Sequence, residues 1–448
     1  MASEKIFSIT GKEIRKQKAS QKKDDKIAEK SLISSIRYWN GFHVFSVLSG
    51  CGLAMSTLTL IPRHNSILHQ EYWFEIILPI GFLRLIWAAA KVLDLNVLIE
   101  NDKLRSIVLF LKIFFTSFVT QVTLYCSSYF FWTRILGHNH PMPLVGIACT
   151  LPTSIIQILS TPFLINSKLL EEEDFKRKMK FFVLHDICWF MTIFMRIFLS
   201  RIFDLLEDTN AQCIIALLIL IMKKFMTCVL TKVVHRMIGN ENEGANVLVA
   251  VSINVCFGFW AATKLAGARN ATLFCMVVLD ILMQANMTHQ IVKIHKKLSV
   301  HGNEKLKLER RTAILRLVVA ELCEGLVPLA YALGFAMAYY GPNSKLIGNV
   351  GNEEWHYKAV DDVSYTFLLM SGLFVIDLIC LSLNSITIWI TSNVNILQEF
   401  CNVLQKYWFV FGLKLAYQMY VPFLSNDVNN GSDRTYKFSW LANNKTSV

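Results

Sequence analysis

Charged residues are scarce in this chain of 448 residues. Asp, Glu, Lys and Arg together supply 17% of it, whereas a soluble protein would carry about 25%. The deficit excludes the two or three soluble domains that a chain of this length normally forms.

Motifs of known catalytic chemistry are absent. There is no GxSxG, HExxH, Walker, GxGxxG or aspartate-rich pattern, and no motif that would hold a cofactor. Connections between apolar blocks reach only about 20 residues, which is too short for a soluble catalytic domain. The sequence therefore favours a protein that is not an enzyme, and an intramembrane enzyme acting on lipid is the alternative.

The eleven cysteines form neither a CxxC pair nor a cluster with histidine at metal-ligand spacing. A disulfide framework or a zinc site is therefore not predicted. Buried free cysteine behaves as a small hydrophobic residue.

Apolar residues are abundant and grouped. They make up 54% of the chain, its mean hydropathy is +0.42, and they form blocks long enough to cross about 30 Å of hydrocarbon. This pattern predicts an all-α polytopic membrane protein with about 10 or 11 transmembrane helices in one bundle. The candidate spans are 41–62, 75–99, 106–132, 141–165, 181–203, 211–235, 246–267, 271–293, 313–340, 363–391 and 407–424.

Three segments follow from these blocks. Residues 1–39 are predicted to form a basic cytoplasmic segment, since they contain no apolar core typical of a signal peptide, and Lys12 to Lys30 are expected to form either a surface helix or a solvated tail. Residues 40–424 form the bundle, in which 394–406 is expected to be an interfacial helix before the last span. Residues 425–448 are predicted to form a short non-cytoplasmic tail.

The net charge of +12 is explained by basic residues that orient the spans in the membrane, rather than by a surface that binds nucleic acid. Lysines and arginines gather in the connections 166–180 and 294–312, whereas 341–362 is acidic. The excess of basic residues on one side predicts a cytoplasmic N-terminus and contact with anionic lipid headgroups. The sequence leaves open the oligomeric state and the choice between plasma membrane and endomembrane.

Glycosylation motifs agree with this orientation, because three of them fall on the predicted outer side. Their acceptors are Asn270, Asn430 and Asn444.

Two carboxylates in the span 313–340 are expensive to bury in lipid. Glu321 and Glu324 share one helix face, and Pro328 removes a hydrogen bond to the carbonyl of Glu324. Such a weakened helix could bind a coupling ion or share a proton. Static pairing with lysines of neighbouring helices is the alternative.

Two further spans carry polar stripes. Asp280 and Gln284 lie four residues apart in one span, and Asp377 and Asn384 lie seven apart in another. Both stripes could line a pathway for a small solute or ion, or they could hold helices together by hydrogen bonds.

Other ionisable residues complete the set of candidates. Asp186 beside His185 could carry protons, and Lys91 could pair with Asp94 within one helix. The counter-charge candidates are Arg84, Lys91, Lys223 and Lys224.

A weak calcium candidate lies after the last span, at Asp427, Asn429 and Asp433. An Asn- and Gly-rich turn explains that pattern as well.

Buried charge on several spans favours a transporter or channel for a small solute or ion. Glu321 and Glu324 would form the coupling-ion or proton site, with Asp280 and Asp377 lining the path. A receptor or scaffold without transport, and a lipid-modifying or lipid-scrambling protein, are the alternatives.

The predicted orientation can be tested on the C-terminal tail. If this tail faces the lumen or the outside, replacing Asn430 and Asn444 by glutamine reduces the mobility shift produced by peptide N-glycosidase. A C-terminal epitope that antibody reaches only after digitonin has opened the plasma membrane, while internal membranes stay sealed, would contradict the orientation.

Overall fold

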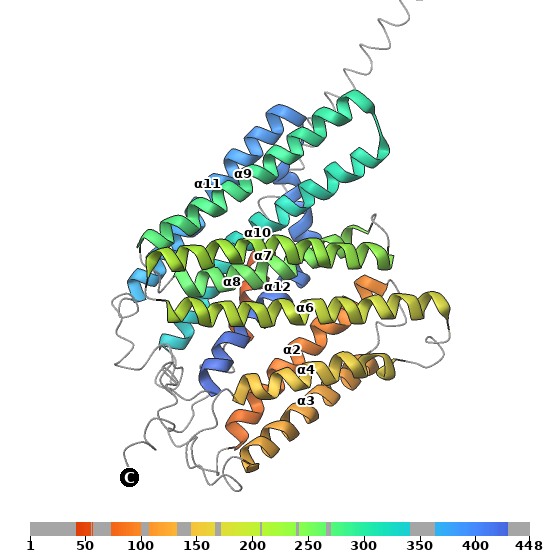
Figure 1. Ribbon diagram of the computed structural model, residues 1–448, viewed down its shortest axis with the longest axis vertical. Coiled ribbons are helices and arrows are strands. Elements are labelled where there is room, and N and C mark those ends of the chain that lie inside the picture. Colours follow the sequence, from red (N-terminus) through yellow and green to blue (C-terminus); the bar gives the residue numbers. More distant parts are fainter. Residues whose placement is uncertain are drawn as a thin grey trace, which may run out of the picture.

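The computed structural model describes residues 42–54, 56, 73–99, 107–131, 145–165, 172–206, 208–238, 242–265, 270–340 and 363–428. The described residues form helices and contain no strand, so the predicted all-α membrane bundle is confirmed (Figure 1). After the helix Phe42–Ala54, the labelled helices are α2 (Trp73–Ile99), α3 (Ile107–Phe130), α4 (Val145–Leu164), α6 (Glu173–Leu205), α7 (Thr209–Ile238), α8 (Glu243–Leu265), α9 (Asn270–His301), α10 (Glu304–Tyr340), α11 (Val363–Ser392) and α12 (Ile396–Val428).

One local expectation is wrong. Residues 394–406 do not form a separate interfacial helix, because α12 runs without a break from Ile396 into the last predicted span. Helix α10 continues on both sides of Pro328, so the hydrogen bond that this proline removes does not end the helix. Neighbouring helices can satisfy the carbonyl that a proline leaves free inside a membrane bundle.

Two tight hairpins join the last four helices, and their sequences explain where the helices stop. Gly302 and Asn393 adopt φ angles of 58° and 52° and end α9 and α11, since glycine and asparagine tolerate the left-handed region best. The side chains of Asn303 and Asn395 then accept hydrogen bonds from Lys305 N and Gln398 N at the start of α10 and α12, as N-cap residues do.

Five described helices are long and apolar enough to cross a membrane: Ile107–Ser128, Thr209–Ile238, Glu243–Ala262, Ala271–Val300 and Leu368–Ser392. Several other long helices contain charged side chains that are buried in the bundle, such as Lys91 of α2, Asp186 of α6 and Lys414 of α12. These charges lower the hydropathy of their helices without facing lipid. The total of ten or eleven crossings stays a prediction.

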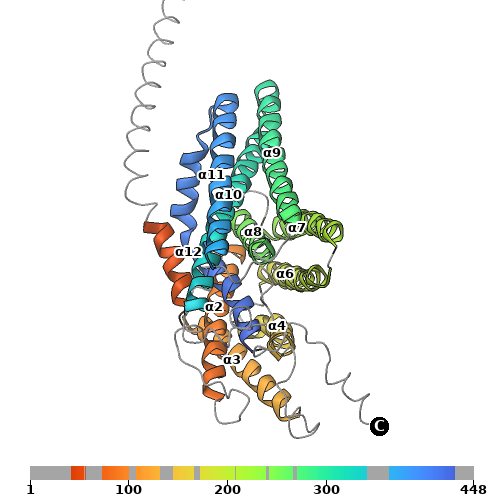
Figure 2. The same cartoon turned by 90° about the vertical axis from the view of Figure 1, so that its left-hand side faces the viewer.

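Helix α8 is the central element of the bundle. It packs on α10, α7, α12, α2 and α6, and nearly all of its apolar side chains are buried. The bundle is elongated, with α3 and α4 toward one end and α9 and α11 toward the other (Figures 1 and 2). A helix that is apolar all round is typical of such a buried position.

The other apolar helices expose much of their surface. Large side chains such as Phe115 of α3, Phe225 of α7, Phe274 of α9 and Ile390 of α11 face outward. A soluble monomer rarely exposes so much apolar surface, and contact with lipid tails explains it here.

Helices α8 and α10 approach closely where α8 has a glycine. A Cβ atom at Gly258 would lie 3.2 Å from Cγ2 of Val327, whereas one at Gly372 of α11 would meet nothing within 4 Å. The small residue allows the two helix backbones to come together, as is common in membrane bundles.

We expect Gly258→Val to lower the stability of the purified protein by about 1–3 kcal/mol, because the added methyl groups overpack this contact. Thermal unfolding in detergent measures the change, and Gly372→Val is the matched control. Equal melting temperatures for the two variants would contradict the packing at Gly258.

Candidate functional site

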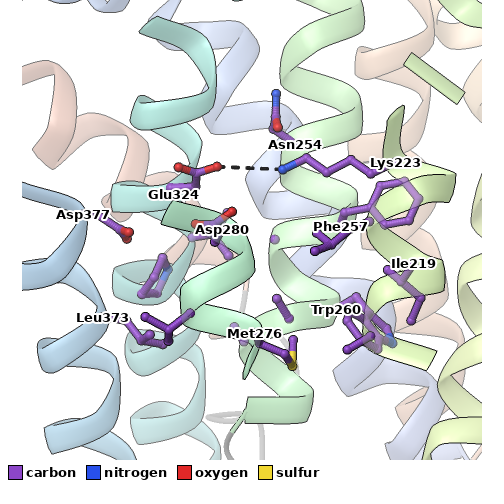
Figure 3. A pocket seen from close by; sticks show the side chains of 18 of the residues that line it. Ile219, Lys223, Asn254, Phe257, Trp260, Met276, Asp280, Glu324, Leu373 and Asp377 are labelled. Atoms are coloured by element: carbon purple, nitrogen blue, oxygen red, sulfur yellow. Dashed lines mark ion pairs between the residues drawn. The ribbon is translucent and has the colours of Figure 1, made fainter. Parts of the chain in front are cut away.

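A cavity of about 120 Å³ lies among α7, α8, α9, α10 and α11. Its wall is mainly apolar, and four charged side chains reach it, one from each of α7, α9, α10 and α11. They are Lys223, Asp280, Glu324 and Asp377 (Figure 3). Residues from four separate helices therefore share one cavity.

Three carboxylates converge at one end of this cavity. One oxygen each of Asp280, Glu324 and Asp377 lies within 4.8 Å of the other two. Oxygen ligands about 2.4 Å from a cation are at most about 4.8 Å apart, so these three could hold one between them. Within the described ranges, neither Asp280 nor Asp377 makes a hydrogen bond or an ion pair.

Among the three converging carboxylates, Glu324 is the one that has a hydrogen-bond partner and an ion-pair partner in the described part of the chain. Gln284 Nε2 donates a hydrogen bond to its Oε2 at 2.5 Å, and Lys223 Nζ lies 3.8 Å from its Oε1. The separation from Lys223 is longer than a well-formed charge-assisted hydrogen bond of about 2.7–2.9 Å. The ammonium therefore neutralises Glu324 without being tightly held by it.

The polar network extends one helical turn farther along α10. Asn384 of α11 donates to Glu321 Oε1 at 2.9 Å and to Gln284 Oε1 at 3.5 Å, and it accepts a hydrogen bond from Thr288 at 2.9 Å. Glu321 is 3% exposed, and its Oε2 has no hydrogen-bond partner among the described residues. The predicted stripes of α9 and α11 thus contact each other directly, beside α10.

Charge is unbalanced in this group, which we call the acidic network: Asp280, Glu321, Glu324, Asp377 and Lys223. In the described part of the chain, Lys223 is the basic side chain that lines the cavity with these carboxylates, and its ammonium lies beside Glu324. Four negative charges beside one positive charge are unstable in a medium of low dielectric constant. Protons or added cations must supply the remaining compensation.

A second buried group, between α2, α6 and α12, is balanced. Lys414 Nζ contacts both oxygens of Asp94 at 2.8 Å, and Lys91 pairs with Asp186. Each partner comes from another helix, so the expected pairing of Lys91 with Asp94 inside α2 is replaced by two interhelical pairs. Asp186 and Lys91 therefore lie in a group that already neutralises itself.

Two buried arginines near this second group bind neutral acceptors. Arg84 donates to Gln121 of α3, and Arg196 donates to Gln418 Oε1 at 3.0 Å and to the carbonyl of Cys256 at 3.2 Å. Arg84 thus does not reach the carboxylates for which it is a predicted counter-charge. Of the four counter-charge candidates, Lys223 is the one beside Glu324.

The remaining candidates lie away from the cavity or outside the described residues. Lys224 points to the exposed face of α7. Asn270 begins α9 and Asp427 lies in the last turn of α12, but their side chains are not described. The other predicted residues outside the described ranges are Asn429, Asn430, Asp433 and Asn444, together with the basic segment 1–39.

Sequence reasoning missed several polar residues at helix contacts. Arg196 and Gln418 are both buried, and each is a polar residue within an apolar block, a signal that could have revealed them. Asn254 lines the cavity from α8, and its position in an otherwise apolar span was a comparable signal.

Comparison with known proteins adds no family to these observations: no protein-family model matches the chain, and neither a curated protein nor a solved structure shows significant similarity to it.

The balanced group can be tested by breaking one of its pairs. We expect Asp94→Asn to lower stability by about 3–5 kcal/mol, because it leaves the buried Lys414 ammonium without its partner. Thermal unfolding in detergent measures the loss.

Two controls accompany this variant. Asp94→Leu combined with Lys414→Met removes both charges and is expected to recover most of the stability. Lys406→Met breaks an exposed contact with Glu243 and is expected to cost about 1 kcal/mol or less. A double variant no more stable than Asp94→Asn would argue against the ion pair.

Proposed function

We propose that this chain transports or conducts a small cation, and that Asp280, Glu324 and Asp377 bind the cation inside the bundle. The convergence of these carboxylates on one cavity is the observation that supports the proposal most. The surplus of negative charge supports a cation over an anion as the substrate. The balanced pairs of α2, α6 and α12 serve as the rigid support for the helices that carry the site.

In this proposal, Lys223 acts as a resident counter-ion. Its ammonium lies 3.8 Å from Glu324, close enough to neutralise the carboxylate in the absence of substrate. An arriving cation takes over this role and releases Lys223, so Glu324 has a positive charge beside it in either condition. Gln284 keeps Glu324 in place through its hydrogen bond during the exchange.

A second candidate function, movement of lipid headgroups, is favoured by the position of the acids near the lipid-facing surface. The residues that follow Asp280 and Asp377 along their helices, Ile281 and Leu378, are exposed. A polar site this close to lipid could admit a headgroup from the side. Dithionite reduction of a fluorescent phospholipid in proteoliposomes tests this function separately.

The transport proposal is tested by uptake into proteoliposomes, with protons, sodium, potassium and methylammonium assayed one at a time. We expect Glu324→Gln to reduce uptake of the transported cation at least about tenfold, because an amide supplies no charge to compensate it. Cation uptake measured at equal protein incorporation gives the comparison.

The matched control is Glu399→Gln, which removes a carboxylate from the exposed first turn of α12 and should leave uptake unchanged. Both variants are first compared with the unaltered chain by size-exclusion chromatography, so that misfolded protein is not counted. Equal uptake by Glu324→Gln and the unaltered chain would remove these carboxylates from the proposal.

A further inference from the structure

The cavity has two chemically different ends. Figure 3 shows Glu324, Asp280 and Asp377 grouped together, while Ile219, Met276, Trp260 and Leu373 line the space beyond them. Carboxylate oxygens therefore occupy one end, where Lys223 and Asn254 also line the cavity, and aliphatic, thioether and aromatic groups form most of the remaining wall. A ligand that uses the whole cavity needs a cationic head and an apolar body.

The carboxylate end suits an ammonium group better than a divalent metal ion. Calcium takes six to eight oxygen ligands, whereas the described lining offers three carboxylates beside a largely apolar wall. A primary ammonium has three N–H donors, which equals the number of converging carboxylates. The cavity already contains a group of this kind, because Lys223 brings its own alkylammonium to Glu324.

The size of the cavity limits the apolar body. A volume of about 120 Å³ holds roughly eight water-sized groups at about 15 Å³ each. A primary amine with a chain of a few carbons fits this space together with its ammonium group. Phe257 and Trp260, which are almost fully buried, would contact the chain rather than solvent.

We infer that the cavity binds a small primary organic ammonium ion, with its ammonium between Asp280, Glu324 and Asp377 and its apolar chain against Leu373 and Trp260. This inference rests on the proposed function, since it names the class of cation that the same site takes. Glu321 lies one turn away with one unpartnered oxygen and adds to the negative field that favours the ammonium.

An aminophospholipid headgroup contains the same ammonium. Its phosphate lies two carbons from the nitrogen, however, and would meet the same carboxylates that attract the ammonium. Like charges at such separations repel strongly in a medium of low dielectric constant. The free amine is therefore the source that the cavity favours.

The inference is tested by isothermal titration of the full chain in detergent with methylamine, n-butylamine, butan-1-ol and sodium chloride near pH 7. Each buried methylene is expected to strengthen binding roughly fourfold, so butylammonium should bind at least about tenfold more tightly than methylammonium. Butan-1-ol, which has the same chain without charge, should not bind measurably.

Two variants separate the ends of the cavity. Leu373→Ser is expected to reduce the preference for butylammonium severalfold and to leave methylammonium binding unchanged, whereas Asp377→Asn should weaken both amines. The matched control is Leu383→Ser, which alters an exposed leucine on the same helix and should change neither.

Several results would overturn the inference. Equal affinity for the two amines, or binding of butan-1-ol as tight as that of butylammonium, would show that the apolar wall and the carboxylates do not act together. Competition by phosphatidylethanolamine for the butylammonium site would assign the ammonium to a lipid headgroup instead of a free amine.

The outcomes also separate this inference from the proposed function. Uptake of sodium or potassium that depends on Glu324, without any preference among amines, would remove the inference and leave cation transport standing. Binding that increases with chain length, without uptake that depends on Glu324, would remove transport and leave an amine-binding site.

Discussion

Compensation of buried charge is the constraint on which the rest of this structure depends. Lipid tails solvate neither carboxylates nor ammonium groups, so each charge inside the bundle needs a partner from another helix. The pair of Lys414 with Asp94 ties α12 to α2, and the pair of Lys91 with Asp186 ties α2 to α6. Helices with too much charge to face lipid are thereby held in the interior.

The two buried charged groups differ in the way they meet this constraint. The group of α2, α6 and α12 contains equal numbers of paired lysines and aspartates, so it needs nothing from outside. The acidic network contains four carboxylates and one lysine, and Asp280 and Asp377 have no hydrogen-bond or ion-pair partner among the described residues. A balanced group suits a structural role, whereas the unbalanced charge of the acidic network is the basis of the proposal that it binds a cation.

Helix α8 joins the wall of the cavity to a polar contact with α6. The carbonyl of Cys256 in α8 accepts a hydrogen bond from Arg196 of α6. The neighbouring residues Phe257, Gly258 and Trp260 of α8 line the cavity. Because α10 packs closely on α8 at Gly258, the position of Glu324 depends on this contact. The exposed apolar helices α7, α9 and α11 then close the cavity on the side toward lipid.

The sequence by itself determined the helical class, the approximate helix positions and the polar residues worth attention. Hydrophobic block length identifies a span, and the spacing of Asp280 and Gln284 or of Asp377 and Asn384 puts each pair on one face of its helix. Only the tertiary structure decided which faces meet: Lys223 rather than Arg84 lies beside Glu324, and Asp94 pairs with Lys414 rather than with Lys91. The reason is physical, since periodicity along a helix fixes the direction of a side chain but not its neighbours, which depend on how distant helices pack.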